Sequence, residues 1–135
     1  MKMYDERDFV ILASSRSGTN DQYQDGIVLG HAYSVISVFE FQAYGQNVQL
    51  MKMRNPWGKQ GEWTGDWSDE SDLWTDEYRE ICGSSIGDDG IFFIPLENYL
   101  THFCETSVGV REEHCHVSVA NYQKDRTAYY KFKLD

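Results

Sequence analysis

Two strand-like segments on either side of a short turn place the strongest constraint on this fold. Residues 31–41 and 47–54 are rich in β-branched, aromatic and methionine side chains, and residues 43–46 between them read Ala-Tyr-Gly-Gln. A glycine-containing turn between two such segments predicts an antiparallel β-hairpin. Because side chains alternate between faces along a strand, His31, Tyr33 and Val35 are expected on one face of the first strand.

The predicted hairpin brings His31 and Asn55 to the same end of the molecule. His31 begins the first strand, Asn55 follows the second, and the turn lies about midway between them. A carboxamide oxygen beside an imidazole can accept its N–H, which fixes the tautomer and supports the imidazolium form. A histidine on a strand commonly has only a structural role. Its pairing with Asn55, next to the indole of Trp57, favours an active site instead.

The segment 54–69 concentrates large aromatic side chains. Three of the four tryptophans of the chain lie in it: Trp57, Trp63 and Trp67. Large exposed apolar side chains are uncommon on a soluble monomer, so a surface loop of this composition is expected to pack against the core. A packed structural loop and a loop that contributes to an active site are the two interpretations of this segment.

Composition excludes several classes of partner. The chain of 135 residues has 41% hydrophobic and 15% aromatic residues, which is too apolar for a disordered protein. Its formal charge of -10 argues against nucleic acid and anionic membranes, which bind basic surfaces. No apolar run reaches the roughly 18–20 residues of a membrane helix. The three cysteines are odd in number and lack CxxC spacing, which favours reduced thiols and an intracellular, cytoplasmic location.

The remaining segments predict an α+β fold dominated by antiparallel sheet, with a few short helices. Residues 9–13 and 90–94 are expected to form strands. One helix is expected to start at Ser71 as N-cap and to stop at Gly83, and another to run from Pro95 to about Cys104. Cys82 and Cys104 are expected as small buried residues on these helices. His102 is expected on the helix surface.

Three segments together resemble the second half of the catalytic core of calpain cysteine proteases. They are residues 30–35 (Gly-His-Ala-Tyr-Ser-Val), 53–58 (Met-Arg-Asn-Pro-Trp-Gly) and 62–69 (Glu-Trp-Thr-Gly-Asp-Trp-Ser-Asp). Residues 89–94 are similar to the family's next strand, and the helix from Leu96 follows it. The resemblance implies the His/Asn lobe of a papain-like core over residues 1–106. Residues 107–135 would then be a linker and the first strands of a following β-sandwich, or they would pack back onto the lobe.

By this resemblance, His31 is the general base and acid, Asn55 orients it, and Trp57 shields their hydrogen bond from water. The family's nucleophilic cysteine lies upstream of the histidine, yet no cysteine precedes His31 in this chain. The chain is therefore expected to pair with an upstream Cys-bearing lobe of the same protein, to act on protein substrates in that context, and to be inactive alone. The rival interpretation is a non-catalytic calpain-like binding or scaffold module.

An acidic segment raises the question of calcium. Between residues 62 and 89 there are ten carboxylates and one arginine, Arg79. This is either a solvated surface or a calcium site, since calcium prefers carboxylate and carbonyl oxygens. The resemblance implies Glu62, Asp69 and Asp89 as calcium ligands. Ile91 occupies the position of a further family carboxylate and cannot coordinate a cation. A calcium-binding domain without catalysis is the third interpretation.

Overall fold

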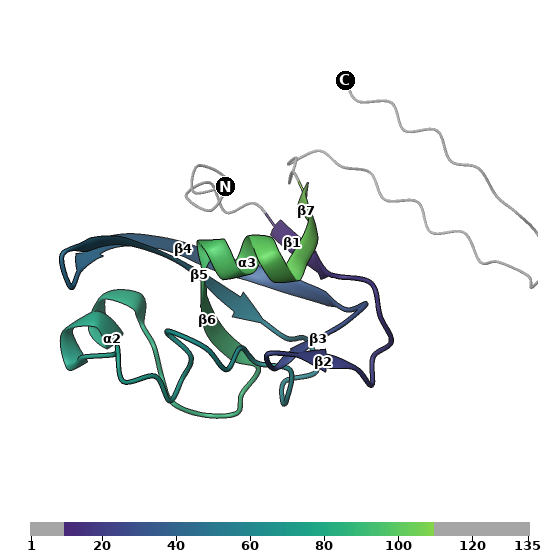
Figure 1. Cartoon of the computed structure of the whole chain (residues 1–135), viewed down its shortest axis with the longest axis horizontal. Coiled ribbons are helices and arrows are strands. Elements are labelled where there is room, and N and C mark those ends of the chain that lie inside the picture. Colours follow the sequence, from purple (N-terminus) through teal and green to yellow (C-terminus); the bar gives the residue numbers. More distant parts are fainter. Residues whose placement is uncertain (1–9, 110–135) are drawn as a thin grey trace, which may run out of the picture.

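The computed structural model of the chain describes residues 10–109, and its main feature is a five-stranded antiparallel sheet (Figure 1). The strand order is β6-β5-β4-β1-β7, and β2 and β3 form a separate two-stranded sheet. The elements are β1 Val10–Ser15, β2 Tyr23–Gln24, β3 Ile27–Val28, β4 Ala32–Ala43, β5 Gln46–Arg54, α2 Asp76–Cys82, β6 Ile91–Pro95, α3 Leu96–His102 and β7 Phe103–Gly109. The predicted α+β fold class is confirmed.

The hairpin of β4 and β5 forms as the sequence predicts. Tyr44 and Gly45 occupy the turn with φ of 51° and 76°, the left-handed pair that a two-residue hairpin turn needs. The strands pair from the turn back to Ser34 opposite Arg54. One extra residue between Val35 and Ser37 makes a bulge in β4, which increases the local twist of the hairpin.

The neighbouring strands β5 and β6 carry buried side chains on both faces. Met53 and Phe92 belong to one core cluster, which also contains Tyr99 of α3. Leu50 and Phe93 belong to the second cluster. The core is divided into two clusters because successive side chains along a strand point to opposite faces of the sheet. The helices α3 and α2 accordingly lie on opposite sides of the curved strands (Figure 1).

The chain after α3 departs from the sequence prediction. Residues 103–109 form β7, which pairs with β1 along its length. Cys104 therefore lies exposed on a strand and not buried on a helix, whereas Cys82 is buried at the end of α2 as expected. The sheet also continues three residues past the predicted lobe boundary at 106. The rest of the predicted second region, residues 110–135, lies outside the described residues.

The helix α2 begins later than predicted. Its N-cap is Thr75, whose hydroxyl accepts the backbone N–H of Tyr78 at 3.2 Å, and not Ser71. Ser71 instead takes part in a turn in which its hydroxyl accepts the N–H of Leu73. Gly83 ends the helix with a φ of 59°, as predicted. Among residues 10–109, no helix is long and apolar enough to cross a membrane.

Candidate active site

The hairpin places His31 and Asn55 in direct contact. His31 lies just before β4 and Asn55 just after β5, and the distance from His31 Nε2 to Asn55 Oδ1 is 2.9 Å. Because the amide oxygen can only accept, Nε2 carries the proton of this bond. The proximity predicted from the hairpin is confirmed, while the catalytic roles of the two side chains stay predictions.

The orientation of the Asn55 amide is fixed by its other partners. Asn55 is fully buried, and its Nδ2 donates to the carbonyl of Gln60 at 2.7 Å. Its Oδ1 also accepts the backbone N–H of Trp57 at 3.1 Å. A carbonyl on one side and an N–H on the other allow only one assignment of the amide oxygen and nitrogen. Asn55 therefore presents its oxygen to the imidazole.

A tight loop at residues 58–61 wraps around the Asn55 amide. Gly61 has a φ of +66°, and a Cβ there would lie 2.6 Å from Asn55 Nδ2. The hydroxyl of Tyr33 donates to the carbonyl of Gly61 at 3.1 Å and accepts the N–H of Val28 at 2.9 Å. Burial raises the pKa of Tyr33 to about 12. The Tyr33 hydroxyl thus joins the small sheet, the loop and β4 behind the His31–Asn55 pair.

The backbone of His31 is held by Ser15, a residue that the sequence analysis did not single out. The Ser15 hydroxyl accepts the N–H of His31 at 2.9 Å and donates to its carbonyl at 3.0 Å, and the Ser15 N–H reaches the same carbonyl. Gly30 precedes His31 with a φ of +60°, and a Cβ there would lie 2.2 Å from the carbonyl of Gly18. Nothing in the local sequence marks Ser15, since its role arises only when β1 lies beside β4.

Two aromatic rings flank the imidazole of His31. The ring of Trp57 is centred 4.3 Å away at a tilt of 42°, and that of Tyr33 lies 4.9 Å away, edge to face. Trp57 is 47% exposed, so it covers the histidine from the solvent side. Within residues 10–109, Nδ1 of His31 has no hydrogen-bond partner. An imidazole oriented through Nε2 and open at Nδ1 can accept a proton there and return it.

Trp63 and Trp67 have a structural role that separates them from Trp57. Both are buried, at 6% and 5% exposure, and they belong to the two different core clusters. The indole N–H of Trp63 donates to the carbonyl of Asp66 at 2.8 Å. Both interpretations of the tryptophan-rich segment therefore apply, to different residues: the loop packs on the core, and Trp57 alone lies beside His31.

The three predicted calcium ligands each accept a backbone N–H group, and the bonds of Glu62 and Asp69 join two loops. Glu62 accepts from Gly90 at 2.7 Å, Asp69 from Gly87 at 3.0 Å, and Asp89 from Ile91 at 2.9 Å. Burial, with repulsion from Asp69, Asp88 and Asp89, raises the pKa of Glu62 to about 7. Burial likewise raises the pKa of Asp69. These carboxylates lie near enough to repel one another.

The carboxylates do not converge into a metal site in this arrangement. Within the described part of the chain, no three His, Cys, Asp or Glu side chains are placed to hold one ion. Glu62, Asp69 and Asp88 instead line a pocket of about 280 Å³ between the two loops. Asp88 also accepts the N–H of Gln60 at 2.7 Å, next to the loop that holds Asn55. Asp88 thus connects the second acidic loop to the loop that holds Asn55.

The buried His102 corrects another expectation. The sequence predicts this residue on the helix surface, but it is 3% exposed, and its Nε2 lies 2.8 Å from the carboxylate of Asp25. Its Nδ1 lies 2.8 Å from the carbonyl of Asn98. The backbone carbonyl of Asp25 in turn accepts the N–H of Thr64. His102 thus connects α3 with the turn between β2 and β3 and with the loop that follows Glu62.

Comparison with known proteins places these features in a family. Residues 1–109 match the family profile described as calpain family cysteine protease. The chain is similar to calpain-9 of Rattus norvegicus, with 38% identity over 86 residues, which is 62% of this chain. It is similar to calpain clp-4 of Caenorhabditis elegans, with 33% identity over 90 residues, or 64% of this chain.

A calpain of Schistosoma mansoni is 30% identical over 139 aligned residues, which include the whole chain. The aligned segments span only 12%, 13% and 18% of the rat, nematode and fluke relatives, so the chain corresponds to a small part of each protein. The family profile, by contrast, covers most of the present chain. The chain belongs to the calpain family of cysteine proteases.

Proposed function

We propose that this chain supplies the histidine and asparagine half of a calpain-like cysteine endopeptidase. The observation that carries the proposal is the 2.9 Å contact between His31 Nε2 and Asn55 Oδ1, with Nδ1 left without a partner among the described residues. A nucleophilic cysteine would come from an upstream lobe of the same protein. Alone, the chain would have no peptidase activity, because no cysteine precedes His31.

In the proposed reaction, Nδ1 of His31 accepts the thiol proton and the thiolate attacks the scissile carbonyl carbon. The imidazolium then gives this proton to the leaving amine as the C–N bond breaks, which leaves a thioester. Water attacks the thioester, its proton passes through Nδ1 to the thiolate, and the acid product leaves. Asn55 keeps the ring in the orientation that this cycle needs, and Trp57 limits access of water to the Asn55 bond.

The test uses the full-length protein treated with an epoxide that alkylates active cysteine-protease thiols, followed by mass spectrometry. We expect one modified cysteine upstream of His31 and loss of this adduct in His31→Ala. His31 is only partly buried, so this variant should retain its fold. An adduct that persists in folded His31→Ala would contradict the assigned role of His31.

A non-catalytic binding module is the second candidate, and the missing carboxylate at Ile91 favours it. It predicts no adduct from a folded, full-length protein, with or without calcium. Retention of His31, Asn55 and Trp57 in one contact cluster favours the enzyme instead, because a purely structural lobe needs no imidazole covered by an indole.

Calcium binding by the acidic loops is part of the proposal. Its support is the number of carboxylates at Glu62, Asp69, Asp88 and Asp89, because calcium takes six to eight oxygen ligands. Their present hydrogen bonds to backbone N–H groups would have to rearrange, since the described side chains form no ready site. Titration calorimetry of the chain with calcium tests this. Absence of heat at millimolar calcium, or equal heat with Glu62→Gln, would remove calcium from the proposal.

An intracellular location completes the proposal. Cys82 and Cys104 are free thiols in the described part of the chain, as expected in a reducing compartment. Cell fractionation of the tagged full-length protein tests this, and recovery from the secreted fraction would contradict it.

A further inference from the structure

Among the strands of residues 10–109, none lies beside the outer edge of β5 near the hairpin turn. The neighbouring strand β6 pairs with β5 only from Leu50 onward, because the chain turns into α3 at Leu96. The first four residues of β5, Gln46 to Gln49, extend past this point. A segment of sheet edge is therefore open next to the start of α3.

The register identifies which backbone groups face this open edge. In a two-residue hairpin, the pair next to the turn, Ala43 and Gln46, exchanges both hydrogen bonds. Alternation then directs the N–H and C=O groups of Asn47 and Gln49 away from β4. Among residues 10–109, no backbone or side-chain group bonds to these outward groups. Such groups are a template for strand addition.

The side chains of these two residues are held away from the edge. Asn47 donates to a carboxylate oxygen of Glu40 at 2.8 Å, and Gln49 donates to the same oxygen at 3.2 Å. Gln42 donates to Asn47 at 3.2 Å. These bonds lie across the face of the hairpin, so the polar side chains do not fold over the edge to satisfy its backbone.

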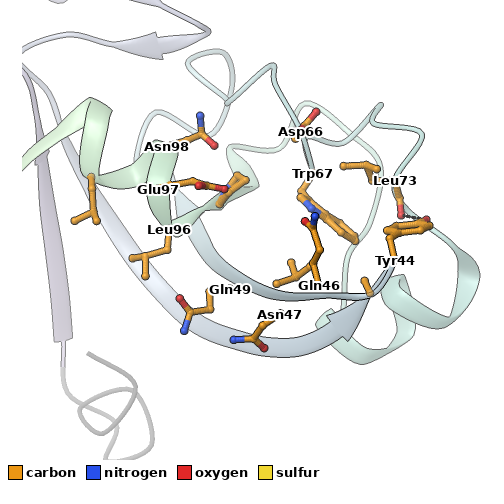
Figure 2. Close-up of a pocket in the computed structure, with 14 residues that line it drawn as sticks. Tyr44, Gln46, Asn47, Gln49, Asp66, Trp67, Leu73, Leu96, Glu97 and Asn98 are labelled. Carbon is orange, nitrogen blue, oxygen red and sulfur yellow. Dashed lines mark hydrogen bonds between the residues drawn. The ribbon is translucent and has the colours of Figure 1, made fainter.

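A groove of about 500 Å³ runs along this edge (Figure 2). β5 contributes Gln46 to Gln49, the start of α3 contributes Leu96 and Glu97, and the segment before α2 contributes Asp66 and Trp67. Figure 2 shows these residues around one hollow, with side chains from three separate elements. The walls of the hollow are polar in part and apolar in part, with Trp67, Leu73 and Leu96 as apolar members, and its β5 side is a backbone edge that can form hydrogen bonds.

The negative charge of the groove favours a basic partner. Asp66 and Glu97 are its only charged lining side chains, and the described lining residues include no lysine, arginine or histidine. The groove lies at the turn end of the hairpin, whereas His31 and Asn55 lie at the other end. We propose that this groove binds an extended segment of a protein partner that carries Lys or Arg, adding it as a strand along Asn47 and Gln49.

The test uses the whole 135-residue chain and a blocked octapeptide, Thr-Lys-Val-Lys repeated twice, as the probe. NMR should show saturable shifts and slower hydrogen exchange at the amides of Asn47 and Gln49. The amide of Val48 is an internal control, since it already faces β4. An N-methylated version of the peptide, which lacks backbone donors, should bind much more weakly, and so should a version with Glu in place of Lys.

Variants of the acidic lining residues measure how much charge contributes to peptide binding, apart from the backbone edge. Glu97→Gln and Asp66→Asn should each weaken binding of the lysine peptide by about two- to fivefold, the size expected for exposed ion pairs. Glu105→Gln on β7 is the matched control, because it removes one exposed carboxylate at the opposite edge of the sheet, and it should leave affinity unchanged.

Three outcomes would overturn the proposal. The first is no saturable shift at millimolar peptide. The second is equal binding of the glutamate peptide, which would exclude a basic partner. The third is slow exchange of the Asn47 and Gln49 amides in the free chain: if it depends on protein concentration, a second copy occupies the edge, and if it does not, another segment of the same chain does. These results leave the proposed peptidase function untouched, since the groove lies away from His31.

Discussion

The carboxylate of Asp25 holds the imidazole of His102 at 2.8 Å, although the two residues lie 77 positions apart. Asp25 occupies a turn with a φ of 50°, and Gly26 beside it has no room for a side chain, since a Cβ would lie 1.9 Å from the carbonyl of Glu62. Because the carbonyl of Asp25 also accepts the N–H of Thr64, His102 is connected through this turn to the loop that follows Glu62.

His102→Ala should lower the free energy of unfolding by about 2–4 kcal/mol, because it removes a buried ring together with its contacts to the Asn98 carbonyl and the Asp25 carboxylate. Urea denaturation measures this. Asp25→Asn is the milder control, since the amide oxygen can still accept from Nε2. Equal stability of wild type and His102→Ala would show that the contact contributes nothing.

Gly61→Ala should disturb the active-site pair much more than Gly58→Ala. Both glycines have a left-handed φ, of +66° and +73°, so both variants carry similar backbone strain of roughly 1–2 kcal/mol. Only at Gly61 would the new Cβ meet Asn55, while at Gly58 nothing lies within 4 Å. We expect shifted His31 ring signals in NMR spectra of Gly61→Ala alone. The same shifts in Gly58→Ala would attribute the effect to strain.

Asn55→Ala should cost about 2–4 kcal/mol of stability as well as activity in the full-length protein. The residue is fully buried, and its removal leaves the Trp57 N–H and the Gln60 carbonyl without partners. Its turnover should fall less than that of His31→Ala, because Asn55 orients the ring and transfers no proton. Asn20→Ala, on the exposed loop, should stay within about 0.5 kcal/mol of wild type. A loss of stability with unchanged turnover would make Asn55 purely structural.

Stability should fall at alkaline pH in a way that depends on Tyr33. Burial raises its pKa from 10.0 to about 12 in the folded chain. The unfolded state therefore releases this proton first, and the stability present below pH 10 is lost as the pH rises toward 12. Tyr33→Phe should be less stable by about 1–3 kcal/mol near neutral pH, but its stability should fall less steeply above pH 10. Parallel curves of unfolding free energy against pH would contradict this assignment.

The two described thiols should differ in reactivity in the folded chain. Cys82 is 2% exposed, and burial raises its pKa to about 11, whereas Cys104 is exposed on β7. Because the thiolate is the reactive form, brief treatment with iodoacetamide near neutral pH should modify Cys104 and spare Cys82. Peptide mass spectrometry measures both sites, and denaturant should equalise them. Early modification of Cys82 would show that α2 opens readily.

The sequence by itself determined the local features of this protein. The turn at Tyr44 and Gly45, the alternation along β4 and β5, and the stop of α2 at Gly83 all follow from residue types within a few positions. The meeting of His31 with Asn55 was also predictable, since an antiparallel hairpin fixes which residues face each other.

Only the tertiary structure decided the contacts between distant elements. Ser15 holds His31 because β1 pairs with β4, and His102 is buried because α3 lies over the turn at Asp25. Likewise, the chain ends α3 at His102 and forms β7 from Phe103, which pairs with the outer edge of β1 and so satisfies its backbone groups. Such pairings depend on which surfaces meet after folding, and no spacing along the chain specifies them.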